Sequence, residues 1–153
     1  MIIRSATQKD ITELQQLYYE LENDAVAFQP EHFIHGTRGT EFFESIFQIG
    51  NQDILVAEQD GKAVGFAHVI LLEQKKVPCL KPEKVLYLQD LEVAKAFRNQ
   101  GIGTKLIDAC KDFGKKHGAD FMRTQVFPQN TEGMKFYKRS GFSEKMITIE
   151  TYL

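Results

Sequence analysis

A short glycine-containing turn between a strand-like run and an amphipathic helix constrains this chain most. Residues 98–104 read Arg-Asn-Gln-Gly-Ile-Gly-Thr. The first N–H groups of a helix have no partner within the helix, and the aligned peptide dipoles leave partial positive charge there. Gly101 and Gly103 let a ligand approach the backbone, and Arg98 adds a fixed charge. The turn therefore predicts a site for an anion such as a phosphate.

The composition indicates one intracellular globular domain. The chain has 153 residues, of which 42% are hydrophobic and 26% charged, so we expect a single domain over residues 1–153. A net charge of -2 gives no electrostatic reason to expect a nucleic-acid or membrane partner. Cys79 and Cys110 form no C-x-x-C motif, and the first residues lack a long apolar run. These features indicate a cytoplasmic protein.

Local signals predict alternating strands and helices. Thr7 and Asp10 form a capping-box pattern before a helical apolar face, and the Asp60-Gly61 pair is typical of a hairpin turn. Residues 23–39 are expected to be irregular. Strands are predicted at residues 2–6, 54–58, 63–72, 85–93 and 121–127, with one or two more in 142–152; helices are predicted at 11–22, 40–49, 102–117 and 130–139. This order predicts an α/β fold with a mixed sheet.

Three segments together resemble the GNAT superfamily of acyl-CoA-dependent N-acetyltransferases. They are the strand at 87–93 (Tyr-Leu-Gln-Asp-Leu-Glu-Val), the run at 97–106, and residues 130–142. The second matches the family pattern Arg/Gln-x-x-Gly-x-Gly/Ala, and the third matches Asn-x-x-Ala-x-x-Phe-Tyr-x-x-x-Gly-Phe, with Gly133 where alanine is usual. The resemblance implies a mixed, mostly antiparallel central sheet with splayed central strands and helices on both faces.

The resemblance also implies a reaction and a donor site. An acetyl group passes from acetyl-CoA to a primary amine by direct attack in a ternary complex. The turn binds the pyrophosphate, and the pantetheine arm pairs with backbone at Leu91 and Val93, where the Val93 N–H polarises the thioester carbonyl. Asn130 contacts the pantetheine chain. The implied donor-binding residues are Leu91, Val93, Arg98, Asn99, Gln100, Gly101, Ile102, Gly103, Thr104, Asn130 and Tyr137.

Three residues are candidates for proton transfer. Tyr137 matches the tyrosine beside the thioester sulfur and is either a general acid or a packed helix aromatic. Asp90 and Glu92 lie on one side of the predicted strand, because they are two residues apart. Related enzymes often carry a glutamate base at the position of Gln89, whose amide cannot accept the proton. The base is therefore Asp90 or Glu92, another residue, or a water chain.

The first predicted helix and the loop after it are the candidate binding region for the acceptor amine. By the resemblance, this region borders the acceptor pocket, so the predicted substrate-binding residues are Tyr18, Glu22, Phe28 and Gln89. The Glu22 carboxylate suits a small-molecule or peptide amine as acceptor. The charged residues of the helix are equally consistent with a solvent-exposed helix face. Residues 31–35 hold two histidines and one glutamate without a further ligand at metal spacing, so no metal site is predicted.

Other functions leave different signatures. A dinucleotide site needs a third glycine near position 106 and an acidic residue after the next strand, where this chain has Leu106 and residues Gln-Val-Phe at 125–127. A P-loop sequence is absent. A non-catalytic acyl-CoA sensor or interaction module stays open, because binding residues do not establish turnover. A terminal strand reaching Leu153 suggests that a homodimer can form through its edge.

Overall fold

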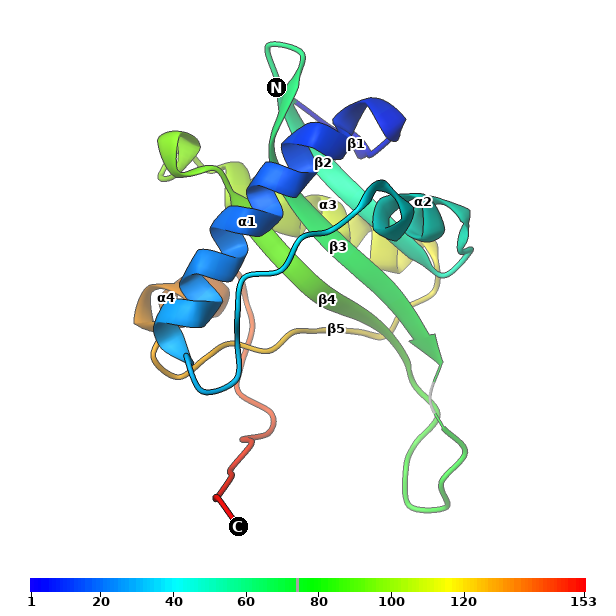
Figure 1. Cartoon of the computed structure of the whole chain (residues 1–153). Helices are drawn as coiled ribbons and strands as arrows, with labels where there is room; N and C mark the ends of the chain where they lie inside the picture. The colour runs from blue at the N-terminus through cyan, green and yellow to red at the C-terminus, as the bar shows by residue number, and fades with distance from the viewer. Residues whose placement is uncertain (74) are drawn as a thin grey trace.

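The computed structural model describes residues 1–73 and 75–153 (Figure 1). Within these residues, strands and α-helices alternate largely as predicted, with two short 3₁₀ turns at Gln8–Asp10 and Lys95–Phe97. The elements, in chain order, are β1 Ile2–Ser5, α1 Ile11–Phe28, α2 Thr40–Gln48, β2 Gln52–Gln59, β3 Lys62–Glu73, β4 Lys84–Val93, α3 Ile102–Lys116, β5 Phe121–Arg123 and α4 Thr131–Arg139.

The strands form one mixed sheet in the order β1-β2-β3-β4-β5. The pairings from β1 to β4 are antiparallel, whereas β4 and β5 are parallel. The β2–β3 hairpin turns at Asp60 and Gly61, whose φ angles are 51° and 79°. Positive φ at both central residues matches the right-handed twist of the flanking strands, as the Asp-Gly pair predicts.

Helices cover both faces of the sheet (Figure 1). On one face, α1 and α2 pack their apolar side chains, including Leu14, Tyr18 and Phe43, against alternate residues of β2 and β3. On the other face, α3 contributes Leu106, Ile107 and Cys110 to a second core, which the half-buried aromatic residues of α4 border. The mixed sheet and its two helical layers confirm the predicted fold class.

A bulge in β4 changes which side chains face each layer. Leu88 pairs with Val69 of β3 and Asp90 pairs with the neighbouring His68, so Gln89 is the extra residue. Leu86 and Leu88 before the bulge lie in the α3 core, and beyond it odd-numbered residues take over that face. The extra residue thus reverses which face of the sheet the odd-numbered and even-numbered side chains occupy along the second half of β4.

The sheet also splays between β4 and β5. Only Val85, Leu86 and Tyr87 of β4 pair with β5 in the described part of the chain. The Thr124 hydroxyl donates to the Leu88 carbonyl at 2.9 Å, after which the two segments diverge. The splayed central strands expected from the family resemblance are therefore present.

Three predicted boundaries were wrong. The α1 helix continues to Phe28, where irregular chain was expected from residue 23, and the Phe28 ring lies 6.1 Å from that of Phe127. The β5 strand ends at Arg123 instead of Phe127, because β4 diverges from it. Residues 142–152 form no strand in the described structure, since no neighbouring strand of this chain lies beside them.

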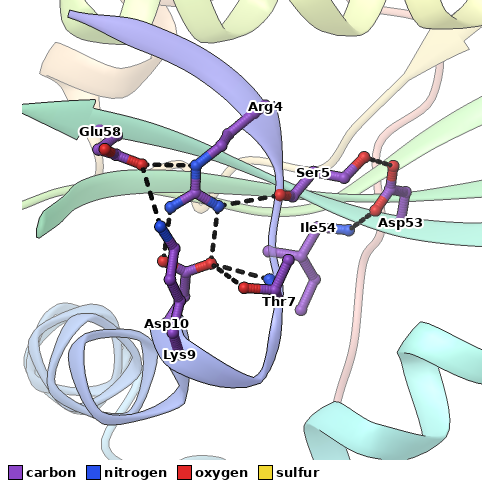
Figure 2. A network of polar contacts seen from close by, with 8 residues as sticks. All are labelled: Arg4, Ser5, Thr7, Lys9, Asp10, Asp53, Ile54 and Glu58. Atoms are coloured by element: carbon purple, nitrogen blue, oxygen red, sulfur yellow. Dashed lines mark hydrogen bonds and ion pairs between the residues drawn. The ribbon is translucent and has the colours of Figure 1, made fainter. Parts of the chain in front are cut away.

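A polar network joins the first strand to the start of α1 (Figure 2). The Arg4 guanidinium donates to both oxygens of Asp10 at 2.8 Å and to Glu58 at 2.5 Å. The Asp10 carboxylate also accepts the Thr7 N–H at 2.8 Å, which confirms the reach-back contact of the predicted capping box. Burial alone would raise the pKa of Asp10, but the bonds from Arg4 and Thr7 lower it overall.

Replacing Asp10 with asparagine tests this network. Because the Asp10 side chain is only 4% exposed, we expect Asp10→Asn to lower the free energy of unfolding by about 3 kcal/mol at neutral pH. A carboxyl group with a lowered pKa stabilises the fold above its unfolded pKa, so the difference should shrink below about pH 4. Urea unfolding of both proteins across pH measures it.

The exposed Lys9 provides the control for that measurement. Its ammonium lies 3.9 Å from Glu58 and its side chain is 64% exposed, so Lys9→Ala should change stability by less than about 0.5 kcal/mol. An Asp10→Asn variant as stable as Lys9→Ala would show that the network contributes little to folding.

Candidate active site

The predicted anion-binding turn, residues 98–104, leads directly into the N-terminus of α3. Asn99 and Gly101 have φ angles of 61° and 80°, and α3 begins immediately afterwards at Ile102. The first helical bond at this end runs from the Lys105 N–H to the Gly101 carbonyl at 3.1 Å. The preceding N–H groups are those that a helix leaves without internal partners. Because Gly101 and Thr104 are exposed, an anion can reach these groups.

The two glycines of the turn serve different purposes. A Cβ at Gly101 would meet open space, so glycine is favoured there by the left-handed backbone angle. A Cβ at Gly103 would lie 3.2 Å from the Phe136 ring of α4. The close packing of α3 on α4 therefore favours a small residue at position 103, a reason that the sequence did not reveal.

Backbone groups of β4 point into the splay between β4 and β5. The Ala94 N–H donates to the Val64 carbonyl of β3 at 2.9 Å. Since successive residues of a strand direct their backbone groups to opposite sides, those of Leu91 and Val93 point away from β3. The paired part of β5 stops opposite Tyr87. Leu91 and Val93 thus present backbone donors and acceptors where the sheet opens, while their side chains face α3.

Arg98 turns back toward β4. Its Nε donates to the Val93 carbonyl at 3.0 Å and its Nη2 to Glu92 at 2.5 Å, while Asp24 of α1 lies 3.7 Å from Nη2. Burial raises the pKa of Glu92 to about 7, although the Arg98 guanidinium opposes this rise. In this arrangement, Arg98 fixes the end of β4 and neutralises a buried carboxylate.

A second polar cluster surrounds Asp90 on the α1 face. The Tyr18 hydroxyl donates to Asp90 Oδ2 at 3.0 Å, and His68 Nδ1 lies 3.6 Å from the same oxygen. The Nε2 atom of His68 is 2.8 Å from Gln52 Oε1, which can only accept, so Nε2 carries the ring proton. His68 Nδ1 is then a free acceptor, and it is a buried atom without a hydrogen-bond partner in the described structure.

His68 was not among the predicted site residues. An isolated histidine in an apolar strand usually packs or faces solvent, and nothing in the local sequence connects it with Asp90. The connection depends on the β3–β4 register and its bulge, which place the two residues opposite each other. Asp90 and Glu92 do share one side of β4, as predicted.

The α4 helix carries Asn130 and Tyr137. The Asn130 side chain accepts the Gly133 N–H at 2.9 Å and thereby caps the helix. Tyr137 packs against Phe136 and Phe142. Burial raises the pKa of Tyr137 to about 12, against a lowering hydrogen bond with the Thr124 side chain. Because Thr124 also bonds to β4, Tyr137 lies beside the point where the sheet begins to open.

The predicted acceptor residues are distributed over neighbouring sites. Tyr18 and Glu22 line a cavity of about 360 Å³ between α1 and residues 36–38, although Tyr18 itself is only 1% exposed. Glu22 pairs with Arg38 and accepts the Gly36 N–H at 3.1 Å, which holds this loop on α1. Phe28 faces Phe127 after β5, and Gln89 is exposed at the bulge. Tyr18 is the member of this set that contacts the Asp90 cluster.

Residues 1–73 and 75–153 contain neither a metal-binding cluster nor a membrane-spanning helix. No group of three histidine, cysteine or acidic residues is arranged to hold a metal ion. The helices described there include none with the length and hydropathy needed to cross a membrane.

Most of the chain matches the sequence model of a known family. Residues 10–142 match the model of the Acetyltransferase (GNAT) family. The chain therefore belongs to the GNAT acetyltransferase family, which confirms the resemblance of the three sequence segments.

Individual relatives agree with this assignment. An uncharacterized N-acetyltransferase of Methanocaldococcus jannaschii is 26% identical over 145 residues, which are 95% of this chain and 62% of that protein. The chain thus spans less than two thirds of that relative. An aminoglycoside N(6')-acetyltransferase of Salmonella typhimurium is 30% identical over 101 residues, which are 66% of this chain and 69% of that protein.

Solved structures show the same fold. A mutant of the BH1408 protein from Bacillus halodurans matches with a TM-score of 0.95 and 26% identity, covering 100% of this chain and 99% of that chain. An aminoglycoside N-acetyltransferase in complex with CoA matches with a TM-score of 0.77 and 23% identity, covering 99% and 98%. A protein of this fold has therefore been solved with CoA.

The Asn130 cap explains the glycine that departs from the family pattern. A Cβ at Gly133 would lie 2.4 Å from Asn130 Nδ2 and 2.7 Å from its Cγ. We expect Gly133→Ala to displace the cap, while the better helix propensity of alanine offsets part of the loss.

A double-mutant cycle measured by urea unfolding tests this coupling. Asn130→Ala should cost about 1 kcal/mol in the natural protein. The same change should cost nearly nothing when Gly133→Ala is already present. Equal costs in both backgrounds would contradict the displacement of the cap.

Proposed function

We propose that this protein transfers the acetyl group of acetyl-CoA to a primary amine by direct attack in a ternary complex. The observation that carries the proposal is the position of the open α3 turn beside the unpaired backbone of β4. An anion site and a strand-like groove lie next to each other, and coenzyme A has a pyrophosphate joined to an extended, amide-containing arm. The GNAT family assignment supports the same donor.

In this proposal, each part of acetyl-CoA is bound by a particular group of the protein. We assign the pyrophosphate to the N–H groups of residues 100–104, where the helix end favours negative charge. The amides of the pantetheine arm then pair with the backbone of Leu91 and Val93. Asn130 borders the same groove, although its side-chain oxygen is engaged by the α4 cap. Arg98 contributes through its bond to Val93 and not through a direct phosphate contact.

The reaction needs an oxyanion donor, a base and an acid. The amine nitrogen attacks the thioester carbonyl carbon, a C–N bond forms, the C–S bond breaks, and the products are an amide and the CoA thiol. In this proposal, the Val93 N–H donates to the developing oxyanion. Asp90 accepts the proton that the nitrogen loses, and Tyr137 protonates the departing sulfur.

We propose Asp90 as the base in preference to Glu92. The Glu92 side chain is 6% exposed and is already paired with Arg98, whereas the Asp90 side chain is 20% exposed. The free Nδ1 of His68 beside Asp90 can receive the proton next. This leaves the carboxylate ready for another cycle. Tyr18 orients the carboxylate from α1, so the α1 layer is coupled to the chemistry.

The acceptor in this proposal is a small cationic amine. On the α1 side of β4, burial and then the charges of Asp24 and Glu20 raise the pKa of Glu92, and this group of carboxylates attracts positive charge. The Salmonella typhimurium relative acts, by its name, on aminoglycosides, which carry several amino groups. We therefore place polyamino compounds first in an acceptor panel and peptide amino termini second.

Ligand-induced stabilisation tests the donor site. A ligand that binds only the native state raises the melting temperature, so acetyl-CoA and CoA should stabilise the protein and NAD should not. Gly101→Val should weaken the CoA response at least about 10-fold in apparent Kd, because valine is strained at this backbone angle and projects from the turn.

Gly118→Val is the matched control for the donor site. Gly118 has a φ of 75° and open space around its missing Cβ, but it follows the other end of α3. Both variants therefore carry the same backbone strain, and only Gly118→Val should keep the CoA response. Full CoA binding by Gly101→Val, or stabilisation by NAD alone, would exclude the proposed donor site.

Thiol release from acetyl-CoA with the amine panel tests turnover. Tyr137→Phe and Asp90→Asn should each lower kcat about 100-fold with a smaller change in the acetyl-CoA KM, because each removes a proton-transfer group. Tyr152→Phe, which alters an exposed tyrosine outside the site, should leave kcat unchanged. An unchanged kcat in Tyr137→Phe would assign that residue to packing.

The same assay separates catalysis from sensing. Confirmed CoA binding with no thiol release across the panel would favour a non-catalytic acyl-CoA sensor. The presence of Asp90, His68 and Tyr137 around the opening of the sheet favours turnover, since a sensor has no use for proton-transfer groups there.

A further inference from the structure

The connection between α1 and α2 is fastened to one face of α1. Residues 29–39 form neither helix nor strand, and in Figure 1 they run back beside α1 before α2 begins. The Gln15 side chain donates from Nε2 to the Arg38 carbonyl at 2.8 Å. The Gly36 N–H donates to the Glu22 carboxylate at 3.1 Å. Because Gln15 and Glu22 are seven positions apart on the helix, both contacts come from the same face of α1.

The Arg38 side chain lies over the ring of Tyr18. The central carbon of its guanidinium is 4.0 Å from the Tyr18 ring centroid and 5.4 Å from that of Phe42. The guanidinium also pairs with Glu22, and the Arg38 side chain is only 29% exposed. A cation attracts an aromatic face more strongly when it is partly removed from water. Arg38 thus holds the Tyr18 ring from the side of the connecting segment.

The sheet holds the same ring from the other direction. Phe66 of β3 lies 4.5 Å from the Tyr18 ring between centroids, and Phe43 of α2 lies 5.8 Å away. Tyr18 is only 1% exposed. Its hydroxyl, at the far end of this enclosed ring, donates to Asp90 Oδ2 at 3.0 Å. The position of the ring therefore sets the position of the hydroxyl beside Asp90.

The protonation of Tyr18 gives this contact one direction. Burial raises the pKa of Tyr18 and the Asp90 charge raises it further, whereas Arg38 lowers it by a smaller amount. Tyr18 therefore keeps its proton at neutral pH and is the donor to Asp90. Within the described residues, Oδ2 of Asp90 has this contact and Oδ1 accepts no hydrogen bond. The bond from Tyr18 thus leaves Oδ1 as the open carboxylate oxygen.

We infer that Arg38 is a positioning residue for acetyl transfer, which it serves by holding the Tyr18 ring so that the hydroxyl orients Asp90. The side-chain hydrogen bond and ion pair of Arg38 in the described structure go to Glu22, so its effect on Asp90 passes through Tyr18. Arg38 has this role only if Asp90 is the base, so the inference rests on the proposed function. The segment between α1 and α2 then contributes to proton transfer without contacting the reacting atoms.

The kinetic test uses thiol release from acetyl-CoA with the amine that gives the natural protein its highest kcat. Arg38→Met keeps the length of the side chain and removes its charge. Because small displacements of a catalytic group slow the reaction strongly, kcat should fall about 10-fold. The acetyl-CoA KM should change less than about 2-fold, since the donor site is not altered. Arg38→Lys, which returns a cation to the ring, should recover most of the lost kcat.

Gln15→Ala is the matched control. It removes the side-chain bond to the Arg38 carbonyl and leaves the guanidinium in place. Its kcat should stay within about 2-fold of the natural value, because the Tyr18 ring keeps its cation. A loss of kcat in Gln15→Ala equal to that in Arg38→Met would mean that any loosening of residues 29–39 slows the reaction, which overturns the specific role of Arg38.

A double-mutant cycle shows whether Arg38 acts through Tyr18. Tyr18→Phe removes the hydroxyl and should lower kcat by at least as much as Arg38→Met. Combining the two substitutions should then lower kcat no further than Tyr18→Phe alone, because both remove the same contact with Asp90. Losses of kcat that multiply would show that Arg38 acts by a separate route and would overturn the inference.

The Tyr18 hydroxyl proton gives a readout that does not depend on turnover. Buried and bonded to Asp90, it should give a slowly exchanging NMR signal that is assigned by its loss in Tyr18→Phe. Arg38→Met should shift or broaden this signal, Arg38→Lys should restore it, and the amide spectrum shows that each variant is folded. An unmoved signal in Arg38→Met, or a kcat equal to that of Gln15→Ala, would overturn the inference alone. A natural protein that releases no thiol with any amine would contradict the proposed function and the inference with it.

Discussion

The β-bulge at Gln89 is the constraint on which the proposed site depends. By adding one residue to β4, it directs Asp90 and Glu92 toward α1 and Leu91 and Val93 toward α3. The same strand thus presents acidic side chains to the α1 layer and apolar side chains to the α3 layer, while its free backbone groups point into the opening beside β5. Beyond this point β5 diverges from β4, so the sheet has an opening between its two helical layers.

The two carboxylates of β4 illustrate how local pairing assigns different roles. Glu92 is buried against Arg98, which also binds the Val93 carbonyl and so fixes the strand end. Asp90 is tied to Tyr18 and lies beside an unpartnered His68 nitrogen, so it has both an orienting donor and a proton acceptor. Two residues of one chemical type, two positions apart, therefore divide into a structural pair and a candidate base.

Local signals predicted the parts of the fold that depend on neighbouring residues. The Asp60-Gly61 turn and the Gly101 helix start both formed as expected, since each depends on backbone angles within a few positions. The bulge at Gln89 and the short β5 depend on register between distant strands, which periodicity does not encode. Residues 142–152 have strand propensity, but no strand of this chain lies beside them and the predicted strand does not form in the described structure.

The side-chain partners of the site were the least predictable part. Arg98 was expected to face the pyrophosphate and instead binds Glu92 in the described structure, and His68, which was not among the predicted site residues, lies 3.6 Å from Asp90. Both outcomes result from contacts that form only after the sheet assembles. The motifs of the family resemblance lie on β4, α3 and α4, so the candidate site that they predict falls in one region of the fold.

Backbone amide chemical shifts recorded during titration with CoA show whether the turn and the unpaired β4 backbone bind one ligand. Large shifts are expected for Leu91 and Val93 together with residues 100–104, and small shifts for β1 and β2. Shifts confined to the turn would show that the opened sheet does not receive the ligand. Shifts centred on another surface would contradict the proposed groove altogether.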